Sequence, residues 1–289
     1  MARAVVLLEA IRPRQWVKNL LVAAAPAAAT ELGDPEVAGR TVVAFAVFTM
    51  AAGATYLGND AADASIDRLH PTRRNRPVAS GRLDPRTAQV AAAVLATVAL
   101  AIAWATAPAL AAVIAVYLGV NIAYSLGMKR VPVLELAAVA SGFALRAIGG
   151  GAATDVALST AFVVVVSAVS VLIVSAKRGA ELARTNGIDG RLVLRYYTTR
   201  GLGRVRVIAS MVAVIAYAAW VFTADVIDGT AATVSATVSL LAFAGSIASY
   251  ERAVDAGLGE DPEEILRLDR RLQVLALAWV ASYGIAIHV

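Results

Sequence analysis

The stretch LSTAFVVVVSAVSVLIVSA, residues 158–176, has no charged side chain and is long enough to cross the hydrocarbon core of a bilayer as one α-helix. Apolar runs of similar length recur along the chain, at about 16–31, 40–58, 87–105, 108–127, 132–151, 205–223, 230–248 and 272–288. The sequence therefore predicts an all-α, polytopic membrane protein with nine transmembrane helices.

The overall composition supports this class. Of the 289 residues, 59% are hydrophobic and 16% are charged, whereas a soluble domain carries about 25% charged residues. The chain has no cysteine, which excludes a disulfide, a thiolate nucleophile and a Cys-ligated zinc site. Its two histidines, His70 and His288, are too few for a metal site built from histidine.

The distribution of basic residues predicts the orientation of the helices. All but two of the 26 Lys and Arg residues fall in the N-terminal segment or in alternate connections, namely 59–86, 128–131, 177–206 and 249–271. Because basic loops stay on the cytoplasmic side, we expect the N-terminus and these loops to be cytoplasmic in a multi-pass protein of the cell (inner) membrane. The net charge of +5 then faces membrane lipid or an anionic substrate, and no nucleic-acid partner is expected.

A polar cluster follows the second apolar run. The motif Asn59-Asp60-x-x-Asp63-x-x-x-Asp67 places three carboxylates within a narrow sector of a helix, and the arginine-rich run 70–81 comes directly after it. Oxygen donors of this kind suit Mg²⁺, which completes its coordination with water and substrate phosphates. Arginines beside them can bind the remaining phosphate oxygens. The cluster is therefore interpreted as a metal–phosphate site, with a solvated polar loop as the alternative.

A second polar segment follows the sixth apolar run, where Lys177 and Glu181 lie one helical turn apart and Asn186-Gly187 is the expected turn. One interpretation is an ordinary i,i+4 ion pair on a solvated face. Helices gain less from Lys before Glu than from the reverse order, so we favour a phosphate pocket that this pair completes opposite the Asp-rich site.

Other polar residues near the cytoplasmic edge are candidate substrate contacts. Lys18 precedes the first run, and Asn121, Tyr124 and Lys129 share one face of the fourth. The alternatives are interfacial anchoring for the cation and interhelical hydrogen bonds for Asn121 and Tyr124. Within the fifth run, ionisable groups at membrane depth are expected to face the bundle interior or a watery cavity; these are Glu135 and Arg146.

The long basic loops follow the second and sixth runs, which indicates an internal duplication. We expect one integral membrane domain, residues 1–289, made of two four-helix units, about 12–127 and 132–250, and a final helix at 272–288.

These features together resemble the intramembrane UbiA prenyltransferase superfamily. Within it, several segments are similar to one branch, the decaprenyl-phosphate phosphoribosyltransferases of bacterial cell-wall arabinan synthesis. These segments are residues 12–19 (RPRQWVKN), 70–81 (HPTRRNRPVASG), Tyr124-Ser125 with Lys129, and Lys177-Arg178-x-x-Glu181. The similarity runs from about residue 10 to the end and implies a UbiA-like helical bundle with cytoplasmic polar loops.

Ordinary members of the superfamily carry a second Asp-rich motif and hold two Mg²⁺ ions against a prenyl diphosphate. This chain departs from that pattern, because Lys177 stands where an aspartate is expected and Glu181 is the carboxylate that remains. The exchange favours a donor with a separate monophosphate, such as phosphoribosyl pyrophosphate (PRPP). The resemblance implies Mg²⁺-dependent transfer of the 5-phosphoribosyl group from PRPP to a polyprenyl (decaprenyl) phosphate, by an enzyme that could be a homo-oligomer.

The resemblance also implies residue roles. Mg²⁺ and pyrophosphate would be bound by Asn59, Asp60 and Asp63. Metal-bound water or ribose hydroxyls would be bound by Asp67 and Glu181. The phosphates of PRPP would be held by Arg73, Arg74, Arg76, Lys177 and Arg178. Candidates for the lipid phosphate are Lys18, Lys129 and Arg130.

Two other functions remain open. A UbiA-type enzyme could transfer a prenyl group from a prenyl diphosphate to another acceptor. A transporter would instead place its acidic residues along a pathway at the membrane midplane, whereas here the polar residues gather toward one membrane face.

Overall fold

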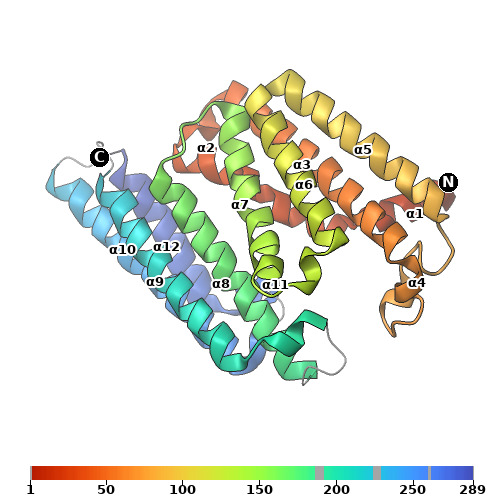
Figure 1. The fold of residues 1–289 in the computed structure, drawn as a ribbon. Coiled ribbons are helices and arrows are strands. Elements are labelled where there is room, and N and C mark those ends of the chain that lie inside the picture. The colour runs from red at the N-terminus through yellow and green to blue at the C-terminus, as the bar shows by residue number, and fades with distance from the viewer. Residues whose placement is uncertain (1, 186–191, 224–228, 260–261, 289) are drawn as a thin grey trace. The chain divides into compact units, whose positions relative to one another are not determined.

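The computed structural model describes residues 2–185, 192–223, 229–259 and 262–288, and these form helices joined by turns, with no strand (Figure 1). The predicted all-α class is therefore confirmed. The expected turn at Asn186-Gly187 lies outside the described residues. Two compact units can be distinguished, one formed by residues 1–128 and 145–157 and the other by residues 129–144 and 158–289. Each unit is described by itself, and the predicted internal duplication stays a prediction.

The first unit contains the N-terminal helices. These are α1 (Ala2–Ala10), the 3₁₀-helix η1 (Pro13–Ala23), α2 (Ala24–Ala28), η2 (Glu31–Gly33), α3 (Pro35–Ala62), α4 (Ala64–Asp67), η3 (Arg73–Asn75), α5 (Pro85–Thr106), α6 (Pro108–Leu126) and the last part of α7 (Leu134–Thr154). Helix α5 lies along α3 and beside α6 (Figure 1). Their shared core includes Val47, Phe48 and Ile114, and the ring of Phe48 meets that of Tyr117 edge-on.

The second unit contains the first part of α7 and the C-terminal helices. These are η4 (Met128–Arg130), α8 (Thr160–Thr185), η5 (Leu192–Tyr196), α9 (Thr199–Thr223), α10 (Thr230–Ala253), the π-helical turn η6 (Val254–Leu258), α11 (Pro262–Leu268) and α12 (Arg270–Ala286). Helix α8 packs along α9, and α10 packs along α12. Tyr217 is central to this core, because it stacks on Phe243 and its hydroxyl bonds Ser239 at 2.5 Å.

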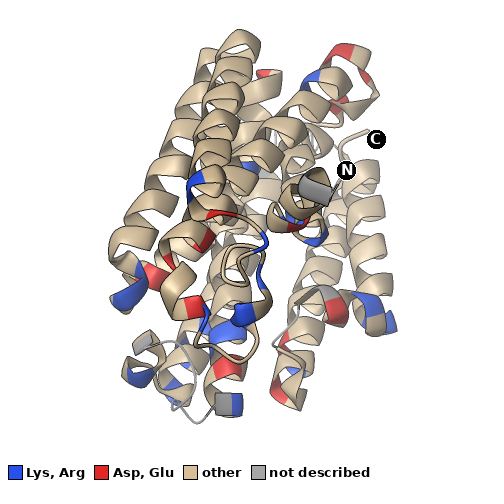
Figure 2. Cartoon of the chain, turned by 90° about the vertical axis from the view of Figure 1, so that its right-hand side faces the viewer, with Lys and Arg blue, Asp and Glu red and all other residues tan. Residues whose placement is uncertain are grey.

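Seven of the nine expected spans are present in the described part of the chain as helices long and apolar enough to cross a membrane, namely α3, α5, α6, α7, α8, α9 and α10. The protein is a multi-pass membrane protein. Figure 2 shows the lengths of the helices largely free of charge, with basic and acidic residues mostly near helix ends and in connecting segments. This distribution is the one that a hydrocarbon solvent favours.

The first expected span, residues 16–31, differs from the prediction. It is not one α-helix, because the 3₁₀-helix η1 is followed by the short α2 and then by η2. Tertiary contacts explain the change: the Asn19 side chain donates to Thr49 Oγ1 of α3 (3.0 Å) and accepts from Arg146 Nε of α7 (2.7 Å). The Val22 carbonyl also packs so closely on Gly150 that any Cβ there would overlap it. Apolar content predicted helical structure in this segment but overstated its regularity.

The last expected span is present as α12, yet its 17 residues fall short of the 18 that mark the other spans. At about 1.5 Å per residue it extends roughly 25 Å, somewhat less than a hydrocarbon core of about 30 Å. Asp269 caps it by accepting from Arg271 N and Leu272 N. The prediction, 272–288, has the same length as this helix and lies two residues further toward the C-terminus.

Candidate functional site

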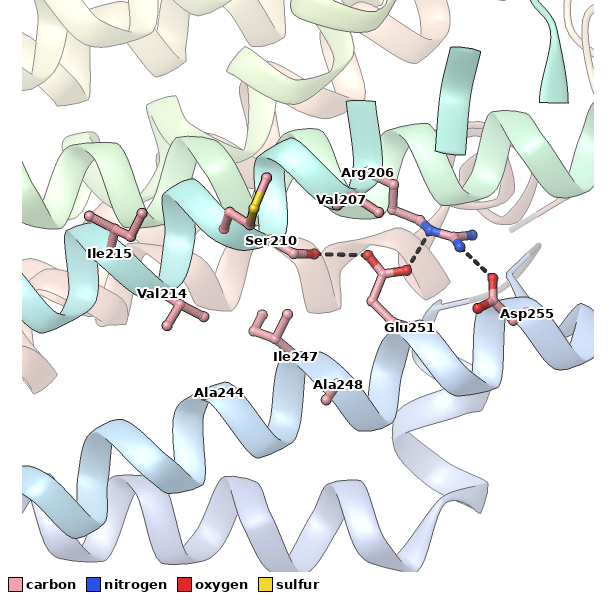
Figure 3. Close-up of a pocket in the computed structure, with 11 residues that line it drawn as sticks. Arg206, Val207, Ser210, Val214, Ile215, Ala244, Ile247, Ala248, Glu251 and Asp255 are labelled. Carbon is pink, nitrogen blue, oxygen red and sulfur yellow. Dashed lines mark hydrogen bonds and ion pairs between the residues drawn. The ribbon is translucent and has the colours of Figure 1, made fainter. Parts of the chain in front are cut away.

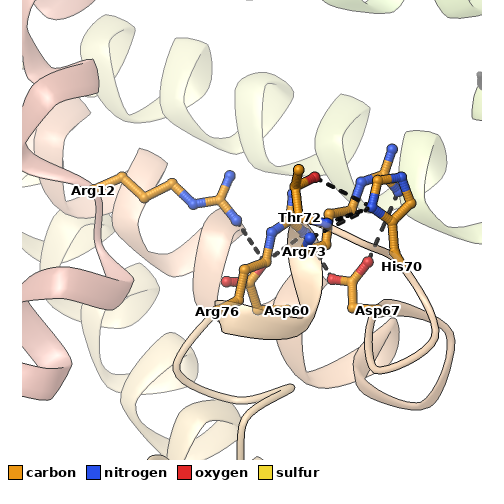
Figure 4. Close-up of polar contacts among 7 residues, drawn as sticks. All are labelled: Arg12, Asp60, Asp67, His70, Thr72, Arg73 and Arg76. Atoms are coloured by element: carbon orange, nitrogen blue, oxygen red, sulfur yellow. Dashed lines mark hydrogen bonds and ion pairs between the residues drawn. The ribbon is translucent and has the colours of Figure 1, made fainter.

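Asp60, in the last turn of α3, is a buried carboxylate surrounded by arginines (Figure 4). Its side chain is 2% exposed, and its Oδ1 accepts from Arg12 Nη2 at 2.5 Å and from Arg76 Nη1 at 3.2 Å. A charged carboxylate this deeply buried needs cationic partners, and these two supply them. Sequence reasoning had expected a cation beside the aspartates, and in the structure arginine provides that charge.

Asp67, at the end of α4, belongs to the same network. It is 1% exposed, its Oδ2 accepts from Arg76 Nη1 at 2.7 Å, and its Oδ1 lies 3.8 Å from Arg73 Nη1. Arg76 therefore joins the two aspartates, seven residues apart in sequence. Of the three predicted phosphate-binding arginines of this loop, Arg73 and Arg76 are held by carboxylates and Arg74 is exposed to solvent.

The three aspartates do not form one continuous helical face. The α-helix ends at Ala62, and Asp63 occupies the break before α4 with φ −93° and ψ 5°. Asp63 is half buried, and the described residues contain no group of three Asp, Glu or His side chains placed to hold one metal ion. The site thus consists of a carboxylate–arginine network with Asp63 beside it in the chain.

The arginine-rich loop is held in position by buried apolar side chains and by an ion pair with a residue far away in sequence. Val78 is buried in a cluster with Leu57 of α3 and Ala10 of α1, and the neighbouring Ala79 is also buried. Arg82 closes the loop by binding both oxygens of Glu9 (2.6 and 2.7 Å), and this hydrogen bond lowers the pKa of the Glu9 carboxyl below its ordinary value. Short-range bonds to His70 Nδ1 from the backbone of residues 72 and 73 shape the start of the loop. The loop therefore presents Arg73 and Arg76 toward the aspartates.

Two residues outside the predicted set belong to this site. Arg12 lies in the left-handed backbone region (φ 55°) directly before a proline, and its guanidinium stacks 4.6 Å from the ring of Tyr56. Such strain is tolerated where surrounding contacts fix the residue, and the bond to Asp60 is one of them. The Ser125 hydroxyl of α6 lies within hydrogen-bond distance of Asn59 Oδ1 and of the Asn121 carbonyl (2.9 Å), and its single hydrogen can be donated to either oxygen. Both residues stand in segments that carried the family resemblance. Ser125 also shares a helical face with Asn121 and Tyr124, whereas no local pattern marked Arg12.

One feature of Asp60 shows that the side-chain oxygens of this site suit Mg²⁺. Asp60 Oδ2 is buried and has no hydrogen-bond partner among the described residues, although Oδ1 of the same carboxylate has two. A buried carboxylate oxygen without a partner is costly, and a hard cation is a ligand that would satisfy it. Mg²⁺ commonly takes one or two protein carboxylates and completes its shell with water and phosphate, so Asp60 with the neighbouring Asn59 and Asp63 fits this ion.

The second predicted polar segment lies at the end of α8. Arg178 is buried and binds both oxygens of the fully buried Glu135 through Nε (2.9 and 3.2 Å), while its Nη1 donates to Glu181 Oε2 (2.9 Å). Lys177 is exposed and has no ion pair with any described residue, so the alternative interpretation, an i,i+4 pair with Glu181, is not supported. Glu181 is oriented by arginine and the lysine is left available to a ligand. That this segment meets the Asp-rich site stays a prediction.

The remaining predicted residues are placed as follows. Lys18 is half buried and donates to Gln15 Oε1 at 2.5 Å, and the Asn121 amide donates back to the Tyr117 carbonyl at 2.8 Å. Tyr124 and Lys129 are half buried, and Arg130 is exposed. Arg146 is buried, and besides Asn19 it bonds the Tyr117 hydroxyl at 3.1 Å; it therefore joins α6, α7 and η1.

A groove of about 560 Å³ between α9 and α10 is lined by none of the predicted residues (Figure 3). Its walls are mainly apolar, and a charged group at one end consists of Arg206 with Glu251 (2.5 Å) and Asp255. Both helices are candidate spans, so hydrocarbon is the expected surrounding of this groove. It offers no acid–base or phosphate-binding arrangement of its own, because its arginine is paired with two carboxylates.

Comparisons with known proteins agree with the sequence motifs. The model of the UbiA prenyltransferase family matches residues 20–257. Decaprenyl-phosphate phosphoribosyltransferase of Mycolicibacterium smegmatis is 41% identical, over 98% of this chain and 92% of that protein. The protein of the same description from Mycobacterium tuberculosis is 42% identical, over 96% of this chain and 93% of that protein.

A solved structure shows a similar fold. The UbiA homologue from Archaeoglobus fulgidus bound to GPP and Mg²⁺ aligns with a TM-score of 0.73 over 98% of this chain and 100% of that one. Its sequence is 17% identical, so the similarity concerns the fold.

Proposed function

Because the chain belongs to the UbiA prenyltransferase family, we propose that it transfers the 5-phosphoribosyl group of PRPP to the phosphate of decaprenyl phosphate or a similar polyprenyl phosphate, releasing pyrophosphate. The observation that carries the proposal is the identity of 41–42%, over nearly the whole chain, to proteins described as decaprenyl-phosphate phosphoribosyltransferases. The test is Mg²⁺-dependent transfer of radiolabel from PRPP into an organic extract containing polyprenyl phosphate.

The chemistry requires stabilisation of charge more than proton transfer. As the bond from ribose C1 to pyrophosphate breaks, C1 gains oxocarbenium character and negative charge builds on the leaving group, as in glycoside cleavage. The acceptor phosphate is already anionic and attacks C1 from the opposite face, so no general base is needed. The protein's part is to hold two anionic substrates together and to neutralise the leaving group.

The arginines of the first unit suit the leaving group. Asp60 and Asp67 hold Arg12, Arg73 and Arg76 in place, and each guanidinium has five N–H donors, more than these carboxylates use. Preorganised donors of this kind act on developing charge without a reorganisation cost at the moment of reaction. When bound, Mg²⁺ would rest on Asp60, with Asn59 and Asp63 as further donors, and would supply charge neutralisation on the pyrophosphate.

Other predicted contacts keep their assigned roles. Asp67 and Glu181 are assigned to ribose hydroxyls or metal-bound water, and Asn121 and Tyr124 to substrate contacts near Asn59. Lys18, Lys129 and Arg130 are assigned to the lipid phosphate. In view of its contacts, Arg178 is assigned to orienting Glu181 in addition to any phosphate contact.

Lys177 distinguishes a PRPP donor from a prenyl diphosphate donor. Since its ammonium is exposed and Glu181 is already bound by Arg178, replacing it by alanine removes no ion pair formed with the described residues. We expect Lys177→Ala to weaken PRPP use by about 1.5–3 kcal/mol, the range of a charged hydrogen bond, while thermal stability is unchanged. The dependence of product formation on PRPP and on polyprenyl phosphate measures this.

A matched control is Arg204→Ala, which removes another exposed cation from the same unit. It should leave the dependence of the rate on PRPP and on polyprenyl phosphate unchanged. Lys177→Arg should restore PRPP use only poorly, because a planar guanidinium does not reproduce a compact ammonium. Superimposable PRPP curves for wild type and Lys177→Ala would refute the donor-phosphate role.

The site is assigned to the cytoplasmic face of the cell membrane, where PRPP is soluble and the basic loops are expected. Helix α3 is a candidate span between the acidic segment at Glu31 and the basic loop at Thr72. A single cysteine at Glu31 of this cysteine-free chain should react with an impermeant maleimide on intact cells, and one at Thr72 only after permeabilisation. The reverse pattern would contradict the orientation, and equal labelling would contradict the crossing.

A further inference from the structure

A second pocket, of about 270 Å³, lies in the second unit where α10 and η6 end and α12 begins. It is smaller than the groove between α9 and α10 and differs from it in charge. Its principal lining residues are Ser249, Arg252, Leu258, Leu268, Asp269 and Arg271. None of them belongs to the predicted catalytic or substrate-binding set.

Both arginines of this pocket are exposed, and neither forms an ion pair with a carboxylate of the described residues. Arg252 uses Nε for a long bond to the Ala248 carbonyl of its own helix (3.3 Å), which leaves most of its donors unused. Two guanidinium groups lining one small pocket repel each other in the absence of an anion. The pocket therefore favours a ligand with negative charge.

The one acidic residue of this lining, Asp269, offsets only part of the charge of the two arginines. Asp269 Oδ1 accepts from the backbone of Arg271 (2.8 Å) and Leu272 (3.1 Å), and its Oδ2 accepts from Ser249 Oγ (3.1 Å). The bond to the Leu272 amide is the main reason that the pKa of this carboxyl lies below its ordinary value. Asp269 caps α12 and also attracts Arg252, which lowers its pKa further. With two arginines and one carboxylate, the lining keeps one net positive charge.

The apolar part of the lining indicates where the ligand comes from. Leu258 is 46% exposed and Leu268 is 57% exposed, although both have large apolar side chains. Leu258 also ends the candidate span that begins at Thr230. Lipid headgroups and acyl chains meet at the end of a membrane span. Arginines there can contact the headgroups, and exposed leucines beside them can contact the acyl chains.

We propose that this pocket binds the phosphate of an anionic membrane phospholipid, with Arg252 and Arg271 on the phosphate oxygens and the acyl chains beside Leu258 and Leu268. A soluble phosphate would gain nothing from the leucines, whereas a phospholipid uses both parts of the lining. The proposal is independent of the transferase reaction, since it concerns a site with no predicted substrate-binding residue.

The test is native mass spectrometry of the purified full-length protein in detergent, titrated with dioleoyl phosphatidylglycerol or dioleoyl phosphatidylcholine. Wild type should retain phosphatidylglycerol more tightly. Replacing Arg252 and Arg271 together by glutamine should weaken the tightest bound phosphatidylglycerol by about 30-fold, since one basic residue near an anionic lipid surface is worth about fivefold. Each single variant should show about fivefold weakening, which keeps the test valid if the double variant does not fold.

The matched control removes two neighbouring charges that do not line the pocket, Arg267 and Arg270, again by glutamine. It should bind phosphatidylglycerol as wild type does. Equal affinity of the Arg252/Arg271 variant and wild type would overturn the proposal. Displacement of the lipid from wild type by inorganic phosphate alone would also overturn it, because the ligand would then be soluble phosphate.

Discussion

Replacing Arg178 by alanine is expected to destabilise the protein by about 3–5 kcal/mol, because it leaves a buried carboxylate without its cation. Glu135 is fully buried, and Arg178 binds both of its oxygens while remaining only 4% exposed itself. Glu181 loses its 2.9 Å partner as well. The midpoint of thermal or denaturant unfolding of the purified protein in detergent measures the change.

A double replacement distinguishes the stability contributed by the ion pair from the stability contributed by side-chain packing. Exchanging Glu135 and Arg178 together for methionine removes both charges and keeps apolar volume, so it should restore most of the stability lost in the single variant. Its activity should stay low, because Glu181 would no longer be oriented. A single Arg178→Ala variant as stable as wild type would show that Glu135 is not held as described.

Asp60→Asn is expected to lower activity by more than about 100-fold and to raise the Mg²⁺ concentration needed for half-maximal activity. Groups that merely orient a metal ligand are worth roughly 10- to 100-fold, and a ligand itself should be worth at least as much. The buried, unpartnered Oδ2 is the atom on which this expectation rests. Mg²⁺ titrations of the initial rate at saturating PRPP provide the measurement.

Asp67→Asn is the matched control, because Asp67 is equally buried but both of its oxygens face arginines. It should lower the maximal rate by disturbing Arg73 and Arg76, and it should change the Mg²⁺ dependence less than Asp60→Asn does, because Asp67 is assigned no direct contact with the metal. Should Asp60→Asn show the wild-type Mg²⁺ dependence, the metal assignment would be wrong and Asp60 would serve only to hold Arg12 and Arg76.

Much of the fold was predictable because burial in a bilayer leaves a strong trace in composition. Seven of the nine apolar runs form candidate spans, including residues 158–176 within α8. Residues 16–31 were misread because composition does not report side-chain bonds such as those of Asn19, which impose a 3₁₀-helix over part of the run. Local sequence patterns predict burial well, but they do not predict tertiary hydrogen bonds.

The sequence predicted which residue types form the candidate site. It predicted less well which of their side chains form ion pairs with one another. The proximity of Asp60, Asp67 and the arginine loop follows from short sequence separation. Arg12 lies 48 residues from Asp60, and Glu135 lies 43 residues from Arg178, so neither pair has a local signature. The pattern also suggested that Lys177 could pair with Glu181, whereas Arg178 takes that carboxylate from the same helix.

The central claim is that the group transferred is phosphoribosyl and not prenyl, and one measurement addresses it directly. Purified protein is incubated with decaprenyl phosphate, Mg²⁺ and PRPP labelled either in the ribose or in the β-phosphate, and the mixture is extracted with organic solvent. The account predicts that ribose label enters the organic phase and that β-phosphate label stays in water as pyrophosphate. If neither label enters the lipid fraction, and the same protein instead transfers a prenyl group from a prenyl diphosphate, the account is contradicted.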